Sequence, residues 1–322
     1  MTKSHNYKMV ALCLFVLGLI AGLWENSGSG ERGGHLGVRT NDPRQHFTLR
    51  AEDFWRLRSP DNQRFDASGL VFLNHKLLTV NDRGAAIYEV RFGTNHAAEL
   101  VANPLFGQAA VSKAAGRRGA PSDCEGLALD SQGRLYLSEE SQRSIYRTPA
   151  RGGSVELLPI DWAPVARFFK GGANASFEGV AAGGGKLYVA NEREDPRIIV
   201  VDLETLQVED SYFVDSAGFA IGGAHYSDLA WFEGRLFVLD RNHRCILEVN
   251  PATKKVEVEY AFGQMELAGD MAYRNDYPTG TMEGLAVDRD SFWLVTDNNG
   301  KGRFADRADS RPTLFRCARP RK

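Results

Sequence analysis

The sequence predicts an all-β protein of the β-propeller class, and the prediction rests on one repeated phrase. Five times along 322 residues, a small or acidic residue is followed by glycine or aspartate, an apolar strand, a gap and a second apolar strand. The second position of the phrase is Gly69, Gly126, Gly179, Asp228 and Gly284, giving intervals of 57, 53, 49 and 56 residues. Repeats near 50 residues with strand-like content are typical of propeller blades rather than of helical solenoids.

Each copy of the phrase, called a unit here, has the pattern of a small sheet. The second strands are unbroken apolar runs, as expected of strands that are buried on both faces. They are expected at residues 77–80, 135–138, 187–190, 236–239 and 293–296. Third strands are expected at 87–88, 145–146, 198–200, 245–247 and 314–315, and outer strands at 98–102, 155–160, 207–214 and 256–262.

The outer strands bear on the number of blades. Unit five ends near Cys317 and has no outer strand of its own, whereas an orphan strand at residues 47–57 precedes unit one. We expect this strand to pair with residues 313–317, because that pairing closes the ring and leaves no open sheet edge. Five blades are therefore favoured. Six remain open, since residues 103–123 or 262–282 could hold a degenerate unit.

Composition predicts one globular domain at residues 46–318. The net charge of −2 gives no basic field that would attract nucleic acid, so we expect no nucleic-acid partner. We expect a monomer. The basic tail at residues 319–322 is interpreted as a solvated end.

The first 25 residues are predicted to be a targeting segment. Lys3 and Lys8 precede an apolar run at residues 9–24, which Glu25 ends. We favour an uncleaved signal-anchor, and a cleaved signal peptide is the alternative. Either one predicts an exported protein, periplasmic or extracellular, that meets the membrane only through this segment. Residues 26–45 are interpreted as a flexible tether.

Acidic residues recur at one place in the units. In a propeller, the loop that enters the first strand and the loop that joins the second strand to the third open on the same face. The entering positions predict four ligands for a metal ion: Glu125, Glu178, Asp228 and Glu283. Carboxylate oxygens suit Ca²⁺, and without a cation their crowding would raise some of their pKa values. The alternative is that these acids cap turns or bond to the backbone of neighbouring blades.

The second-to-third loops and the third strands supply further candidates. Their predicted role is substrate binding: Asp82, Arg83, Arg143, Asn191, Arg197, Asp240, Arg244 and Asp297. Arginines beside a metal could hold phosphate or carboxylate. For the three aligned ones that precede the third strands, Arg143, Arg197 and Arg244, pairing with carboxylates between blades is the favoured alternative. His225 and His243 in unit four are the candidate catalytic acid or base, and simple solvation of a loop histidine is the alternative.

Three phrases carry a family resemblance: residues 123–128, 135–140 and 282–286. They resemble the exported phytase-like propellers described as "esterase-like activity of phytase", over about residues 60–317, and more distantly the gluconolactonase and paraoxonase type. The resemblance implies calcium-dependent hydrolysis of an ester or phosphoester. The chain lacks the dense Lys/Arg cluster of the true β-propeller phytases, which argues against phytate as substrate.

Two interpretations of function follow. The first is a metal-dependent hydrolase of small-molecule esters or phosphoesters that acts at the axial mouth. The second is a non-catalytic propeller that binds a ligand or a protein in the cell envelope. Propellers do both, so the fold does not choose between them.

Overall fold

The computed structural model describes residues 42–116, 123–149, 151–170, 172, 175–274 and 279–320, which belong to one compact unit. The predicted targeting segment at residues 1–25 and nearly all of the tether lie outside them. Within the described residues, no helix is both long and apolar enough to cross a membrane.

Each unit forms antiparallel strands in sequence order, as the repeat predicts. Units one and two contain β3 (Ala67–Leu73), β4 (Lys76–Asn81), β5 (Ile87–Phe92), β6 (Ala97–Asn103), β7 (Cys124–Leu129), β8 (Arg134–Glu139), β9 (Ser144–Pro149) and β10 (Glu156–Leu157). Units three and four contain β11 (Phe177–Gly183), β12 (Lys186–Asn191), β13 (Arg197–Asp202), β14 (Val208–Tyr212), β15 (Tyr226–Phe232), β16 (Arg235–Asp240), β17 (Cys245–Asn250) and β18 (Lys255–Ala261). Unit five contains β19 (Met282–Val287), β20 (Ser291–Thr296) and β21 (Thr313–Ala318).

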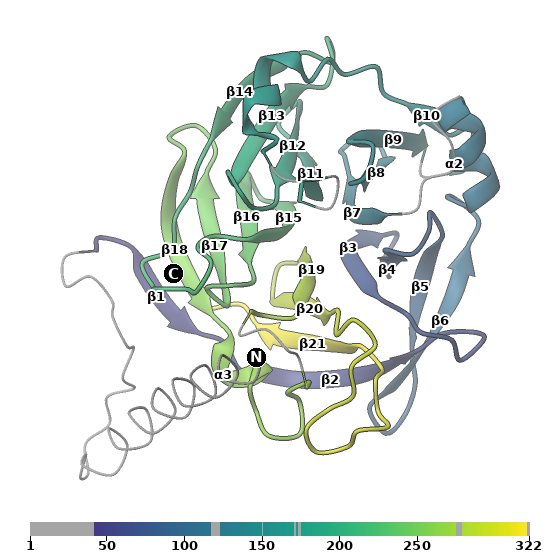
Figure 1. The fold of residues 1–322 in the computed structure, drawn as a ribbon, viewed down its shortest axis with the longest axis vertical. Helices are drawn as coiled ribbons and strands as arrows, with labels where there is room; N and C mark the ends of the chain where they lie inside the picture. The colour runs from purple at the N-terminus through teal and green to yellow at the C-terminus, as the bar shows by residue number, and fades with distance from the viewer. Residues whose placement is uncertain are drawn as a thin grey trace, which may run out of the picture. The chain divides into compact units, whose positions relative to one another are not determined.

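The first strand of every unit is innermost. Contacts run from β3 to β7, β11, β15 and β19 in turn, and from β19 back to β3, so these strands surround one axis (Figure 1). This is the arrangement of a β-propeller. Apolar residues fill the space between the sheets of neighbouring units, for example Leu239 and Phe292 of units four and five.

The N-terminal strand completes unit five. β2 (Ala51–Arg58) pairs antiparallel with β21, with Phe54 opposite Phe315, which is the closure that the sequence predicts. β2 also pairs in parallel with β6, with Leu57 opposite Ala98. Units five and one therefore share one eight-stranded sheet, and the five units make four hydrogen-bonded sheets.

The prediction of a single orphan strand is wrong in one respect. Residues 45–48 form a separate strand, β1 (Gln45–Thr48), which pairs in parallel with β18, with Phe47 opposite Tyr260. The chain leaves this pairing at Leu49, whose side chain is buried in the core between units four and five. β1 thus covers the outer edge of unit four, and only β2 serves unit five.

The two segments that could have held a sixth unit contain little regular structure. Their described residues form α2 (Gln108–Ala115), α3 (Gly263–Glu266) and an isolated bridge between Tyr273 and Arg303, with no additional strand. A 3₁₀ helix at Ala163–Phe168 lies between units two and three.

The glycine of the repeated phrase is explained by packing at the axis. A Cβ atom on Gly126 would lie 2.6 Å from the Val180 nitrogen, and one on Gly179 would lie 2.3 Å from the Asp228 Cα. Each glycine therefore lets its inner strand approach the next one closely. All five inner strands also show a register shift at this phrase, as β-bulges do where a strand is redirected beside a site.

Candidate functional site at the axial mouth

Two sets of residues meet where the inner strands begin. The residue that follows each second strand donates its backbone N–H to the residue that precedes the inner strand of the same unit, at 2.7–3.0 Å. These bonded pairs are Asp82–Asp66, Glu140–Asp123, Glu192–Ser176, Arg241–His225 and Asp297–Thr281. We call these ten residues, with Glu125, Glu178 and Glu283 of the inner strands, the mouth. Its polar side chains converge because every unit repeats the same backbone geometry.

One group of acids belongs to unit two. Ligand oxygens of Asp123, Glu125 and Glu140 all lie within 4.8 Å of one another. Burial, together with the charges of Glu192 and Asp123, raises the pKa of Glu140 to about 8, although its Oε1 accepts the Ser176 N–H at 2.9 Å. Burial and the neighbouring charges of Asp82 and Asp123 hold the pKa of Glu125 well above its usual range.

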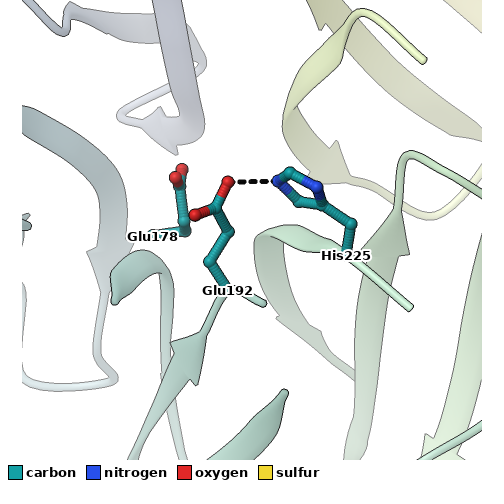
Figure 2. Close-up of side chains that lie close together, drawn as sticks. All are labelled: Glu178, Glu192 and His225. Atoms are coloured by element: carbon teal, nitrogen blue, oxygen red, sulfur yellow. Dashed lines mark ion pairs between the residues drawn. The ribbon is translucent and has the colours of Figure 1, made fainter. Parts of the chain in front are cut away.

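A second group joins units three and four. Ligand atoms of Glu178, Glu192 and His225 also lie within 4.8 Å of one another, and all three side chains are buried. Figure 2 shows the two carboxylates close together, with Glu192 between Glu178 and the imidazole that it pairs with.

The pKa values within this second group diverge. Burial, Glu192 and Glu125 raise the pKa of Glu178 well above its usual range. Burial would raise the pKa of Glu192 as well, but hydrogen bonding and charge from His225, with Arg241 and Arg193, lower it. Burial and the charge of Arg241 lower the pKa of His225 to about 4. The group therefore combines two carboxyl groups whose pKa values are shifted in opposite directions with an imidazole that is neutral at neutral pH.

The acids continue around the mouth to units five and one. Burial, with the charges of Asp297 and Asp66, raises the pKa of Asp82 to about 8, and burial with Asp66 raises that of Asp297 to about 7. Four arginines offset part of this charge: Arg64 and Arg83 pair with Asp66, Arg193 Nη1 lies 2.6 Å from Glu192 Oε1, and Arg241 pairs with Glu283. The mouth is thus an acidic ring that arginines neutralise only in part.

Asp228 differs from the other three predicted metal ligands. It occupies the glycine position of the phrase, and its side chain is fully buried. Its Oδ2 accepts the N–H groups of Leu285 at 2.7 Å and Leu70 at 3.3 Å, and its Oδ1 accepts that of Leu229 at 2.8 Å. The carboxylate therefore ties three inner strands across the axis, which is the backbone-bonding alternative rather than a ligand geometry.

Some of the predicted loop residues lie in the mouth, whereas for others the next residue in the sequence lies there instead. Asp82 and Asp297 lie in the mouth, and Arg83 reaches it through Asp66, 3.6 Å away. Asn191 and Asp240 do not: Asn191 Nδ2 donates to the Asp195 carbonyl at 2.9 Å, and Asp240 Oδ2 accepts from His243 Nδ1 at 2.7 Å. Successive side chains in a strand point to opposite sides, so their neighbours Glu192 and Arg241 face the mouth instead.

The three aligned arginines also serve the loops. Arg143 and Arg197 stack on Phe169 and Phe168, at 4.8 and 4.6 Å from the ring centroids, and Arg244 Nε lies 2.7 Å from Glu266 Oε2. These contacts are with residues outside the mouth. His243 is likewise held by Asp240, so of the two candidate histidines only His225 joins the acids.

Seven of the thirteen mouth residues were not among the candidates selected from the sequence: Asp66, Asp123, Glu140, Ser176, Glu192, Arg241 and Thr281. The available signal was the strand register. Once the last residue of one second strand is known to face outward, the next residue in every unit is placed at the mouth by the repeat.

A family model described as "Phytase-like: Esterase-like activity of phytase" matches residues 65–300. The chain belongs to this family. The match includes every mouth residue, so the acidic ring lies within the phytase-like domain, and the resemblance drawn from the three phrases is confirmed. No curated protein matches the sequence significantly.

Solved structures agree with the propeller fold of this phytase-like chain. Myxococcus xanthus glutaminyl cyclase is similar with a TM-score of 0.57 and 12% identity, covering 86% of this chain and 100% of the cyclase. Virginiamycin B lyase from Staphylococcus aureus has a TM-score of 0.39 and 12% identity, covering 79% of this chain and 66% of the lyase. At such identities, the likeness to the cyclase shows the fold alone.

Proposed function

We propose that this phytase-like propeller hydrolyses ester or phosphoester bonds of small molecules at the axial mouth, with a divalent cation held among the acids. The observation that carries the proposal is the pair of three-residue groups that lie side by side in the mouth. One consists only of carboxylates, and the other combines two carboxylates with a histidine. Family membership supports the ester chemistry.

We further propose that the ring has five blades, with β2 as the outer strand of the fifth. The closed circle of five inner strands supports this count. The shared eight-stranded sheet follows from the extra pairing of β2 with β6. An exported location, through the predicted segment at residues 1–25, is part of the same proposal.

The all-carboxylate group fits Ca²⁺. Hard oxygen donors are what this ion prefers, and Asp123, Glu125 and Glu140 present them within one ligand sphere. Nearby, the buried Asp82 Oδ1 has no hydrogen-bond partner, as expected of a group that a cation would satisfy. A bound cation would polarise the carbonyl or phosphoryl oxygen of the substrate.

The Glu178–Glu192–His225 group is suited to moving protons. Two carboxyl groups with diverging pKa values supply an acid and a base at one pH. Glu192 Oε2, which is buried without a hydrogen-bond partner, would accept the proton of the attacking water. Glu178 would donate its proton to the leaving oxygen, and His225 would hold Glu192 in place. Glu178 thus takes the role of a proton donor rather than of a ligand.

The second candidate function is ligand binding without turnover. The pairing of Glu283 with Arg241 favours it, because an internal counter-ion lets an acidic ring persist without a cation.

Matched variants test the proposal. Glu125→Gln should abolish the thermal stabilisation by Ca²⁺, which amounts to about 2.7 kcal/mol at one hundred times the dissociation constant. Glu178→Gln should keep most of that stabilisation while losing hydrolysis of aryl ester and aryl phosphate substrates. If chelation leaves the melting temperature unchanged and no ester is turned over, the binding function replaces the enzyme.

A further inference from the structure

A cleft opens beside the acidic mouth, and basic side chains outnumber acidic ones in its lining. Its volume is about 1010 Å³, and it is lined by Arg193, Arg241 and Lys301 against a single carboxylate, Glu194. Arg193 pairs with Glu192, and Arg241 pairs with Glu283. An anionic group in the cleft would therefore rely on the donors that Arg241 keeps beyond its ion pair, its Nε among them. The neighbouring ring of carboxylates favours a cation instead.

Two mouth residues connect the cleft to the acids. Arg241 pairs with Glu283, while its Nε is buried without a hydrogen-bond partner. His225 lines the cleft and contacts Glu192, the proposed base. A group bound in the cleft would therefore lie next to the reacting bond.

Asn242 adds an unused polar group to the lining. It is 8% exposed, and its Nδ2 donates to the Gly223 carbonyl at 3.0 Å, which fixes the side chain. Its buried Oδ1 has no hydrogen-bond partner. A buried acceptor without a donor is costly, and a ligand hydroxyl or N–H would satisfy it.

One wall of the cleft is apolar. Phe213 lines it and is 43% exposed, and the connection that follows β14 carries two more exposed apolar side chains, Phe219 at 85% and Ile221 at 64%. A large apolar side chain that is exposed in the wall of a cleft, as Phe213 is, favours an apolar ligand group. The same connection supplies Gly222 and Gly223 to the lining.

The wall that carries Lys301 is held in place by a buried arginine. Arg303 is 2% exposed, and its guanidinium donates to the Met271 carbonyl at 2.7 Å and to the Tyr273 hydroxyl at 2.6 Å. Its Nε also lies 3.1 Å from Asp309 Oδ2. These bonds join the connections before β19 and before β21, so they fix the wall from which Lys301 extends.

We propose that the cleft selects amphiphilic substrates: esters that carry a carboxylate or phosphate group together with an aromatic or other apolar group. The anion would meet Arg193, Arg241 and Lys301, and the apolar group would pack on Phe213. The inference names the substrate class of the proposed hydrolase and rests on it only for the bond that is broken.

Phenylphosphonate tests the cleft because it is anionic and aromatic and has no ester bond. Binding is measured by calorimetry on the full chain in chelator, so that no cation holds the anion. Lys301→Met should weaken binding about tenfold, because it removes a charge-assisted contact. Phe213→Ala should weaken phenylphosphonate by a similar factor and leave methylphosphonate unchanged.

Two variants on the opposite face serve as controls. Lys255→Met removes an exposed lysine at the start of β18, and Phe92→Ala removes an exposed aromatic at the end of β5; neither should change binding. Equal affinity of the wild type, Lys301→Met and Phe213→Ala for phenylphosphonate would overturn the proposal. Binding that needs Ca²⁺ and ignores both variants would also overturn it, while leaving the hydrolase proposal intact. Cation-independent binding without any turnover would support the cleft and sink the hydrolase.

Discussion

At the scale of single residues, the mouth shows how one substitution in a repeat changes its role. Four units place glycine where the inner strands approach each other, and unit four places Asp228 there. Its carboxylate accepts three backbone N–H groups, two of them from other inner strands. Asp228 is therefore a brace between inner strands rather than part of the acidic ring.

The brace can be tested by restoring the repeat. Asp228→Gly should lower the free energy of unfolding by about 2–4 kcal/mol, because it leaves buried N–H groups without an acceptor. Urea unfolding measures the change. The closest control is Ser227→Ala, which removes one hydroxyl bond to the Met282 carbonyl and should cost about 1 kcal/mol. Unchanged stability of Asp228→Gly would show that close approach, and not the carboxylate, governs this position.

The raised pKa values of the mouth predict a dependence of stability on pH. Asp82, Glu140 and Asp297 have folded pKa values of about 8, 8 and 7, above their usual 3.8–4.5. The stability they contribute is complete below the unfolded pKa and is lost as pH rises through the folded one. The loss begins near the unfolded pKa of about 4 and is complete near pH 8, so in chelator the melting temperature should fall between about pH 6.5 and about pH 8.

Calcium should oppose this fall, because a cation replaces the protons that the acids lose. Scanning calorimetry with chelator and with Ca²⁺ at both pH values measures the difference, and Asp82→Asn should reduce the slope in chelator. A melting temperature that rises with pH in chelator would contradict the burial and crowding of these carboxyl groups. The lowered pKa of His225 acts in the acidic range, below this window.

At the scale of elements, the inner strands pack closely because glycine, which has no side chain, stands where they approach each other. A Cβ atom on Gly126 would meet the Val180 nitrogen and the Glu178 oxygen within 2.7 Å. Both contacts are backbone atoms, which cannot move aside as a flexible side chain does. The glycine that follows each glutamate is thus a packing requirement of the ring.

Substituting this glycine should lower stability and also disturb the neighbouring acidic group. Gly126→Ala should lower the free energy of unfolding by about 1–3 kcal/mol through overpacking, and it should shift Glu125 out of its group. Gly107→Ala is the matched control, since a Cβ there meets nothing within 4 Å. Thermal unfolding followed by circular dichroism measures the stability. Ca²⁺ titration measures whether the group of Asp123, Glu125 and Glu140 still binds the ion. Equal melting temperatures of the two variants would contradict the close approach.

Sequence reasoning reached the elements more reliably than the site. The recurring glutamate–glycine pairs and apolar runs located every inner, second and third strand, because a strict repeat averages out local ambiguity. The site depended on which of two adjacent residues faces the axis. Asn191 was chosen over Glu192, and Asp240 over Arg241, since a one-residue change in register reverses the facing of a side chain. The break at Leu49 between β1 and β2 also left no mark in the sequence.

At the scale of the whole molecule, the N-terminal strands decide whether the ring is closed. β1 covers the edge of unit four, whereas β2 lies between β21 and β6 inside the eight-stranded sheet. Residues of β2 also enter the core: Trp55 and Leu57 pack among side chains of units five and one. The stability of the fold should therefore depend more on β2 than on β1.

Two truncations separate their roles. Removing residues 1–48 should leave a monomer with a modestly lower melting temperature, because Leu49 and β2 stay in place. Removing residues 1–58 should cause aggregation, since it exposes the edge of β21 and opens the core. Light scattering and size-exclusion chromatography compare the two proteins. A longer truncation that stays monomeric with an unchanged melting temperature would contradict closure by β2.

The pairing of β2 with β21 also has a consequence for the rate of folding. These strands come from opposite ends of the chain, so their contact forms only after a very long loop closes, and folds rich in such contacts form slowly. A nascent chain can assemble units one to four while unit five still lacks its last partner. Closure is then the final event of folding, and its reversal is a natural first event of unfolding. The lifetime of the native ring would be set by how often this one seam opens.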